Sequence, residues 1–294
     1  MPELPEVETV RRALAPALTG AQIKKVVLNR PDLRFPFPKG MKRDIEGRNI
    51  QSLNRRAKYL LVELDCAKTL VIHLGMSGRL TLSAPNATSR YTAKLVRSAS
   101  CDPKHDHVEF EFKNHTRLTY NDPRRFGFMD LVDTNKLDAH RLFKNIGPEP
   151  LGNTFHADHL VTRAAGRKVD LKAFLLDQRT VAGLGNIYVC EALYRAQLSP
   201  TRPASSLATQ KLKPTQRALR LAPAIRDVLR DAIEAGGSSL KDYRRPDGAL
   251  GYFQHAFDVY GRNDKPCRRN GCTGTVRRLN QAGRSTFYCP KCQR

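Results

Sequence analysis

The sequence predicts an α+β multidomain protein: an N-terminal antiparallel β-sandwich flanked by helices, then a helical region, then a short cysteine-bearing hairpin. Three observations predict this order. Strand-like runs rich in β-branched and aromatic residues lie in the first half, and one of them, 107–113, alternates polar and apolar residues. Helical spacing dominates after the Gly/Pro cluster at 145–150, and four of the seven cysteines fall in the last 28 residues. A chain of 294 residues is also long for one domain, so more than one core is expected.

The N-terminal part is expected to be one helix followed by six to eight strands. Leu4, Val7, Val10, Leu14 and Leu18 have helical spacing, which predicts a helix over 4–18. Runs rich in β-branched and aromatic residues predict strands that form a sandwich or a barrel. The polar stretch between them is expected to be a long surface loop at 83–106. The predicted strands are 23–28, 59–64, 70–74, 107–113, 117–120 and 126–132.

The region after the Gly/Pro cluster is expected to be helical. Three segments with helical periodicity lie at 171–178, 186–196 and 216–235, and Gly236-Gly237 ends the last of them. That long segment is predicted to bury one apolar face made of Leu219, Ala222, Ile225, Leu229 and Ile233.

The charge balance favours a polyanionic partner. Lys and Arg total 51 against 28 Asp and Glu, which gives a formal net charge of +23. Nucleic acid is the usual partner of such a surface; an anionic membrane surface and simple solubility are the alternatives. No run of 18 apolar residues is present, and the acidic N-terminus does not resemble a secretory signal, so a cytoplasmic protein is expected.

The C-terminal cysteines predict a metal site. Cys267 and Cys272 form one pair, and Cys289 and Cys292 form a second pair after a hairpin-sized spacer. Two such pairs can surround one zinc ion as a tetrahedron, and a site made only of thiolates is structural. Disulfides and free thiols are the alternatives. Residues 262–294 also carry nine Lys or Arg and one acidic residue, which suits contact with phosphates.

The N-terminus offers a nucleophile. If the initiator methionine is removed, Pro2 has a free secondary amine, and an α-amine titrates at about 8, well below lysine. Such an amine can attack an electrophilic carbon, with Glu3 beside it as an acid or base. The alternative is an ordinary Pro-Glu helix start, and these residues alone favour that alternative.

Sequence blocks over nearly the whole chain resemble formamidopyrimidine-DNA glycosylases, the bacterial enzymes that excise oxidised purines. The opening residues 2–9 carry the first block of this resemblance. The other blocks follow in the family's order: 55–60, 73–78, 104–108, 122–127, 185–188, 251–253, 259–262 and 286–289. One departure is the first cysteine pair, which has four intervening residues where the family commonly has two.

The resemblance implies a bifunctional glycosylase and lyase that acts through an N-terminal proline Schiff base, followed by β,δ-elimination. Pro2 would attack the sugar C1′, Glu3 would be the acid/base, and Lys58 would donate a proton during elimination. Arg284 would lie near the flanking phosphates, where the second elimination is assisted.

The resemblance also implies DNA-contacting residues, because a base must leave the duplex before its glycosidic bond can be reached. Three residues would fill the space that the base leaves: Met76, Arg124 and Phe126. The residues implied to contact DNA are His73, His105, Arg124, Lys168 and Asn186. Taken alone, Met76 and Phe126 are more typical of core side chains.

The implied domains are a catalytic β-sandwich at 1–135, a linker at 136–152, a helix–two-turn–helix domain at 153–258 and a zinc finger at 259–294. The expected partner is damaged double-stranded DNA, bound by a monomer in the cytoplasm and on the nucleoid, with no membrane partner. Two alternative functions stay open: an endonuclease VIII-like glycosylase for oxidised pyrimidines, and a non-catalytic zinc-dependent protein that binds damaged DNA.

Overall fold

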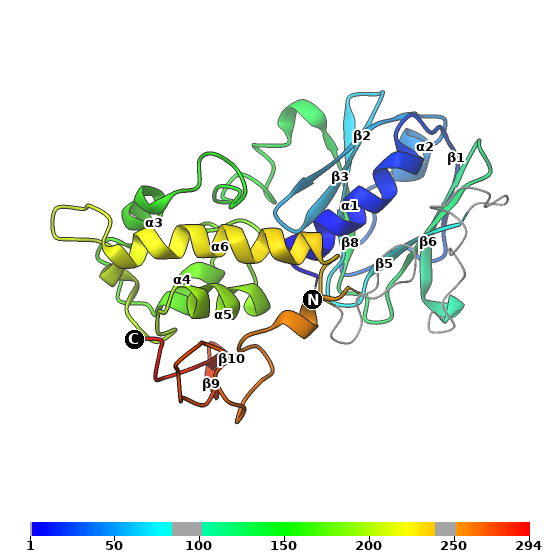
Figure 1. The fold of residues 1–294 in the computed structure, drawn as a ribbon. Helices are drawn as coiled ribbons and strands as arrows, with labels where there is room; N and C mark the ends of the chain where they lie inside the picture. Colours follow the sequence, from blue (N-terminus) through cyan, green and yellow to red (C-terminus); the bar gives the residue numbers. More distant parts are fainter. Residues whose placement is uncertain (1, 84–101, 239–250) are drawn as a thin grey trace. The chain divides into compact units, whose positions relative to one another are not determined.

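The computed structural model describes residues 2–83, 102–238 and 251–294, which form two compact units (Figure 1). The first unit comprises residues 1–144 and 235–252, and the second comprises 145–234 and 253–294. The expectations for Met1 and for most of the loop at 83–106 fall outside the described residues. The four-part division of the chain stays a prediction.

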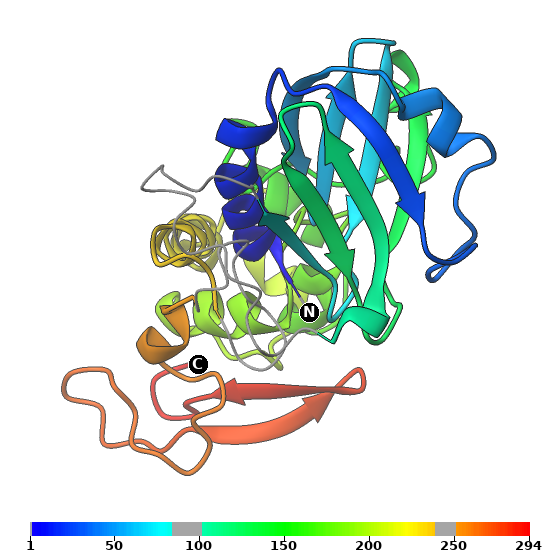
Figure 2. The ribbon, with the colours of Figure 1, turned by 90° about the vertical axis from the view of Figure 1, so that its right-hand side faces the viewer.

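The first unit contains two antiparallel four-stranded sheets, as the sequence predicts (Figure 2). One sheet has the order β1-β6-β7-β5 and the other β2-β3-β4-β8. The strands are β1 (Ile23–Leu28), β2 (Ile50–Arg56), β3 (Tyr59–Leu64), β4 (Lys68–His73), β5 (Arg79–Ser83), β6 (Asp106–Phe112), β7 (Arg117–Asn121) and β8 (Phe128–Asp133).

The alternating sequence explains which strand face is buried. In β6, Val108, Phe110 and Phe112 are buried, while Glu109 and Glu111 point outward and form ion pairs with Arg117 of β7. The predicted helix is α1 (Leu4–Leu18), and its apolar face joins the same core. The short helix α2 (Met41–Ile45) also contributes buried residues to it.

The sequence analysis missed β2 and β5. Both strands have few apolar residues: β2 ends in Asn54-Arg55-Arg56, and β5 buries Leu80 and Leu82 between polar neighbours. Hydrogen bonding to adjacent strands places them in the sheets, so the signal lies in the pairing partner rather than in the segment.

The second unit is helical up to its C-terminal hairpin. Its helices are α3 (Ala157–Ala164), α4 (Leu171–Leu176), α5 (Asn186–Arg195) and α6 (Gln216–Glu234). Two turns connect α4 to α5, and the Gln178 side chain orders them. Its oxygen accepts from the Gly183 amide at 2.9 Å, and its nitrogen donates to the Leu184 carbonyl at 2.8 Å. This is the helix–two-turn–helix element that the resemblance implies.

One predicted core residue of α6 is wrong: Leu219 is 47% exposed. The buried face is centred near Ile225, and six residues at 100° per residue place Leu219 roughly 120° from that centre. Ala218 and Leu221 occupy the buried positions of that turn. Within the described part of the chain, no helix combines the length and apolar character needed to cross a membrane.

The C-terminal segment ends in the hairpin β9 (Arg277–Gln281) and β10 (Arg284–Tyr288). Ala282 and Gly283 form its two-residue turn, both with positive φ, as this type of turn requires. Strand β10 of the hairpin packs against α5 of the same unit, where Asn186 contacts it, and Lys172 of α4 contacts the same strand.

Leu229→Ala and Leu219→Ala form a matched pair on α6. Leu229 is fully buried, so its truncation is expected to lower the free energy of unfolding by about 2–5 kcal/mol. Leu219→Ala is expected to change it by less than about 0.5 kcal/mol, because that side chain is largely in water. Urea unfolding measures both, and equal losses would contradict the orientation of α6.

Candidate DNA-processing site

Pro2 lies at the buried start of α1, next to the N-cap residue Glu3, which is 2% exposed. The Glu3 amide donates to the Glu6 carboxylate at 2.8 Å. The second oxygen of Glu6 accepts from the amide of Ser238 at 2.9 Å and from its hydroxyl at 3.1 Å. Glu6 therefore fixes the N-terminal segment to the chain just after α6, inside the first unit.

Lys58 lies in the tight turn between β2 and β3 and is only 7% exposed, although turn lysines are usually in water. Ala57 before it has φ 52°. His73 of β4 pairs with Tyr59, the residue after Lys58, and the positive charge of Lys58 helps to lower the pKa of His73. The pairing of β3 with β4 therefore places Lys58 near His73.

His73 is neutral in this structure and accepts a hydrogen bond. Burial first, and then the charges of Lys58 and Arg34, lower its pKa to about 4. Its Nδ1 accepts from the Gly75 amide at 3.1 Å, so the ring proton is on Nε2. The ring also stacks on Phe128, at a centroid distance of 5.2 Å. A contact of His73 with phosphate would therefore use a neutral N–H group.

The three residues implied to fill the vacated base position lie on two neighbouring loops. Met76 follows β4 and is half-buried, whereas Arg124 and Phe126 lie in the turn between β7 and β8. Phe126 is 43% exposed, and the Arg124 guanidinium lies 4.8 Å from the centre of its ring. The core reading of Phe126 is therefore wrong, since an exposed ring with a stacked cation is typical of a contact surface.

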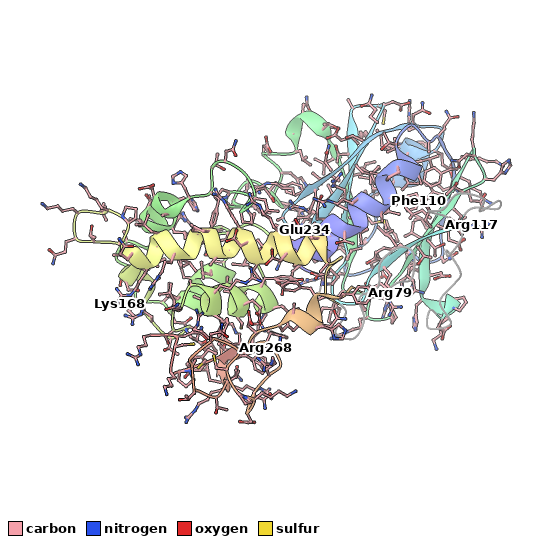
Figure 3. All side chains as sticks on the ribbon, viewed as in Figure 1. Arg79, Phe110, Arg117, Lys168, Glu234 and Arg268 are labelled. Atoms are coloured by element: carbon pink, nitrogen blue, oxygen red, sulfur yellow. The ribbon has the colours of Figure 1, made fainter. Side chains whose placement is uncertain are left out.

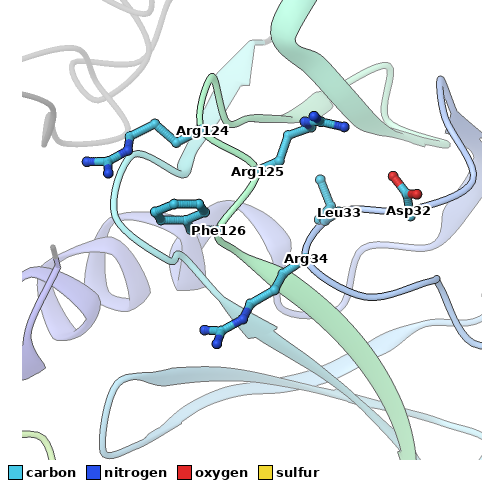
Figure 4. A pocket seen from close by; sticks show the side chains of 6 residues that line it. All are labelled: Asp32, Leu33, Arg34, Arg124, Arg125 and Phe126. Carbon is cyan, nitrogen blue, oxygen red and sulfur yellow. The ribbon is translucent and has the colours of Figure 1, made fainter.

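A hollow of about 450 Å³ lies beside this turn, lined by residues of the turn and of the loop after β1 (Figure 4): Asp32, Leu33, Arg34, Arg124, Arg125 and Phe126. Its guanidinium groups point in different directions, so they do not form one cradle for an anion. Arg124 and Phe126 project to the same side, and Arg125 projects to the other.

His105 ends a 3₁₀ turn before β6 and is half-buried. Its carbonyl accepts from the Asp122 amide at 3.0 Å, so it lies at the base of the same turn. In the second unit, Lys168 is exposed just before α4 and extends into solvent (Figure 3).

The predicted Asn186 and Arg284 come together in the second unit. The Asn186 side-chain nitrogen donates to the Ser285 carbonyl at 3.0 Å, and Arg284 is the exposed first residue of β10. Lys172 of α4 reaches the same strand. Its fully buried ammonium donates to the Ser285 carbonyl at 3.0 Å and to the Thr286 hydroxyl at 2.7 Å. In this structure Asn186 thus holds the hairpin, and its contact with DNA stays a prediction.

The four C-terminal cysteines form the predicted metal site. Their Sγ atoms all lie within 4.8 Å of one another, and two of the pairs, Cys267–Cys292 and Cys272–Cys289, are 3.8 Å apart. A tetrahedron with metal–sulfur bonds of about 2.3 Å has edges of about 3.8 Å, so the arrangement fits zinc. The site holds one structural zinc, because all four positions are thiolates.

Backbone amides support the sulfur ligands. The amide of Arg269 donates to Cys267 Sγ at 3.5 Å, and that of Gly274 donates to Cys272 Sγ at 3.4 Å. A Cβ at Gly274 would lie 2.7 Å from Cys289 Sγ, so only glycine fits there. The four-residue spacing of the first pair therefore still permits the tetrahedral arrangement.

Sequence reasoning missed several buried charged residues, each of which fixes neighbouring segments within its own unit. Lys172 and Asp122 are both fully buried, and so is Glu191 of α5. Glu191 accepts from three consecutive amides, 258–260, at 2.8–3.1 Å, and burial raises its pKa. A charged residue inside an apolar helical face was the available signal for Lys172 and Glu191; Asp122 carries no such pattern.

Three features define the class of this protein: the β-sandwich, the helix–two-turn–helix element and the four-thiolate hairpin. They are typical of DNA-binding proteins with a zinc finger. A model of the formamidopyrimidine-DNA glycosylase N-terminal domain matches residues 1–129, and a model of the H2TH domain of that glycosylase matches 146–244. A model of the zinc finger found in FPG and IleRS matches 264–294. This chain belongs to the formamidopyrimidine-DNA glycosylase family.

Individual relatives agree with the family models. The formamidopyrimidine-DNA glycosylases of Ruegeria sp. and Agrobacterium fabrum are each 56% identical to this chain, with full coverage of both chains. A Lactococcus lactis Fpg in complex with DNA that contains an abasic site has a TM-score of 0.84 at 33% identity, again with full coverage. The Thermus thermophilus MutM (Fpg) protein has a TM-score of 0.81 at 40% identity, covering 99% of this chain and 98% of that one.

Zinc removal is expected to unfold the C-terminal hairpin. The purified protein should contain one zinc per chain by metal analysis, and Cys272→Ser should lose both the zinc and DNA binding. The reason is that the four thiolates around the metal, rather than a large apolar core, order this segment. Cys66→Ser is the matched control, since Cys66 lies outside the cluster and should keep the zinc. A Cys272→Ser protein that retains a full equivalent of zinc would contradict the assignment.

His73 is expected to make stability depend on pH. Its folded pKa of about 4 lies below the usual 6.5, so the unfolded chain takes up the proton first. The contribution is present above about pH 6.5 and is lost as the pH falls toward 4. Between pH 7 and 4.5 the advantage of the wild type over His73→Gln should shrink by roughly 2 kcal/mol. Chemical unfolding at both pH values tests this, with the exposed His255→Gln as control; an unchanged difference would contradict it.

Proposed function

We propose that this protein removes oxidised purines, 8-oxoguanine and formamidopyrimidines, from double-stranded DNA and then cleaves the strand at the resulting abasic site. It is a DNA-formamidopyrimidine glycosylase and DNA-(apurinic or apyrimidinic site) lyase of base excision repair. The observation that carries the residue-level proposal is the position of Pro2, which lies at the buried start of α1 directly before the buried residue Glu3.

The proposed reaction begins at the amine of Pro2, after removal of Met1. The amine attacks C1′ of the damaged nucleotide, the glycosidic bond breaks, and the base leaves with a proton. Glu3 exchanges protons with the sugar and the base as the iminium forms. Lys58, a buried ammonium close to His73, supports the site with positive charge and a proton during elimination.

Strand cleavage follows from the iminium. Loss of a C2′ proton breaks the 3′ C–O bond, and a second elimination breaks the 5′ C–O bond, which leaves a one-nucleotide gap. Arg284, exposed at the start of β10, is proposed to neutralise the phosphate during this second step. Lys172 and Asn186 support that proposal because they hold the adjacent Ser285 carbonyl.

DNA recognition is proposed to combine phosphate contacts with an inserted wedge. Met76, Arg124 and Phe126 would fill the space left by the extruded nucleotide, with Arg124 facing the unpaired base. Further phosphate contacts are proposed for His73, His105, Lys168 and Asn186. The net charge of +23 supports this partner. We further propose that the protein acts as a monomer in the cytoplasm and on the nucleoid.

A blocked N-terminus is expected to abolish the reaction. A chain extended by a cleavable tag before Pro2 should form no borohydride-trapped adduct with DNA containing 8-oxoguanine, because its nitrogen is an amide. Proteolysis that exposes Pro2 is the matched control and should restore trapping at least 100-fold, with mass spectrometry reporting the N-terminal residue. Equal strand scission before and after cleavage would contradict the role of Pro2, and faster release of thymine glycol than of 8-oxoguanine would favour the endonuclease VIII-like alternative.

A further inference from the structure

The two loops that carry Met76, Arg124 and Phe126 meet at a fully buried carboxyl group, that of Asp122. One of its oxygens accepts from the Ser77 hydroxyl at 2.6 Å. The other accepts from the Gly127 amide at 2.9 Å and the Tyr120 hydroxyl at 3.2 Å. We call these four residues, Asp122, Ser77, Tyr120 and Gly127, the Asp122 node.

Each wedge residue is one step away from this node. Met76 precedes Ser77 in the chain, and Phe126 precedes Gly127. The Arg124 amide donates to the Ser77 hydroxyl at 3.2 Å, so the hydroxyl that binds Asp122 also fixes the backbone of Arg124. All three exposed or half-exposed side chains therefore stand on backbone that hydrogen bonds to the node hold in place.

The backbone carbonyl of Asp122 makes two further contacts. It accepts from the Arg125 amide at 3.1 Å and contacts His107 Nε2 at 2.9 Å. Arg125 has φ 56°, in the left-handed region, and this reversal lets Arg124 and Phe126 project to one side of the turn (Figure 4). A non-glycine residue keeps such a conformation where the surrounding hydrogen bonds and packing hold it.

The backbones of the two loops are in close contact. Gly75 has φ 60°, and a Cβ added there would collide with the backbone of Phe126 and Gly127. A Cβ on Gly127 would collide with the Tyr120 hydroxyl, and one on Gly78 would lie 2.5 Å from it. Burial and the neighbouring Asp122 charge raise the Tyr120 pKa well above its usual value, so this hydroxyl stays a donor.

We infer that Asp122, with Ser77 and Tyr120, positions the wedge for entry into the duplex before DNA binds. The inference rests on the proposed function, because it assigns these residues to the extrusion step. A side chain that enters a base stack must displace stacked bases, and a wedge that is ordered in advance avoids a further entropic cost at that moment. The three are positioning residues: they act through Met76, Arg124 and Phe126 and contact no DNA themselves.

The test compares Ser77→Ala and Tyr120→Phe with a control in the same unit. Each variant removes one hydroxyl from the node. Thr69→Val is the control, because Thr69 is also fully buried and its hydroxyl bonds to that of Thr134 at 2.9 Å, in the other sheet. Thermal melting shows whether all three variants stay folded and how much stability each one loses.

Two activities separate positioning from general stability. Excision of 8-oxoguanine from a duplex requires extrusion, whereas borohydride trapping on a single-stranded abasic oligonucleotide does not. Ser77→Ala and Tyr120→Phe should lower kcat/KM for duplex excision by about 10- to 100-fold and change single-strand trapping less than threefold. Thr69→Val should resemble the wild type in both assays.

A double-mutant comparison completes the test. In a background that carries Met76→Ala, Arg124→Ala and Phe126→Ala together, Ser77→Ala should lower duplex excision by less than about threefold, since all three side chains that it would position are already removed. Full additivity, retention of duplex excision by both node variants, or equal losses in the two assays would overturn the inference. A wild type without 8-oxoguanine excision, or a Phe126→Ala protein with wild-type excision, would instead overturn the proposed function or its wedge.

Discussion

Buried carboxyl groups that accept backbone amide hydrogen bonds hold this protein together at the places where loops meet. Glu6 accepts from the amides of residues 3 and 238, Asp122 from that of residue 127, and Glu191 from those of residues 258–260. A buried acid is costly unless donors surround it, so each of these groups restricts its loop to one arrangement. The proposed reactive parts, the N-terminal proline and the wedge, both depend on such a group.

The excess of Lys and Arg makes the surface basic, and the burial of these acids adds to it. The chain has only 28 acidic residues, and three of them lie inside at these junctions, where they pair with neutral amides and hydroxyls rather than with surface cations. Exposed arginines and lysines such as Arg124, Lys168 and Arg284 therefore face solvent with their charge available to a polyanion.

The finger is held by a different principle. Its hairpin has a short apolar face, and four thiolates around one zinc replace the core that so few residues cannot build. Among the side chains that connect it to the helices of its unit, Lys172 and Asn186 share the carbonyl of Ser285. Arg284 directly precedes Ser285. The orientation of the proposed phosphate contact therefore follows from both the metal and these two donors.

The sequence by itself determined the local features with a strong repeated signal. The helix at 4–18, the alternation at 107–113 and the cysteine pairs all predict structure correctly, because periodicity and ligand spacing are properties of adjacent residues. The blocks shared with the family also placed the candidate site residues along the chain. Their agreement over nearly the whole length fixed the order of the three structural parts.

Only the tertiary structure decided what depends on residues far apart in the chain. It paired β2 and β5 into sheets, turned Leu219 outward, and exposed Phe126 where composition favours a core ring. It also joined Ser77 to Asp122, 45 positions away, and Lys172 to Thr286, 114 positions away. The physical reason is that burial and hydrogen bonding of a side chain are set by the neighbours that folding supplies, and those neighbours leave no pattern in the local sequence.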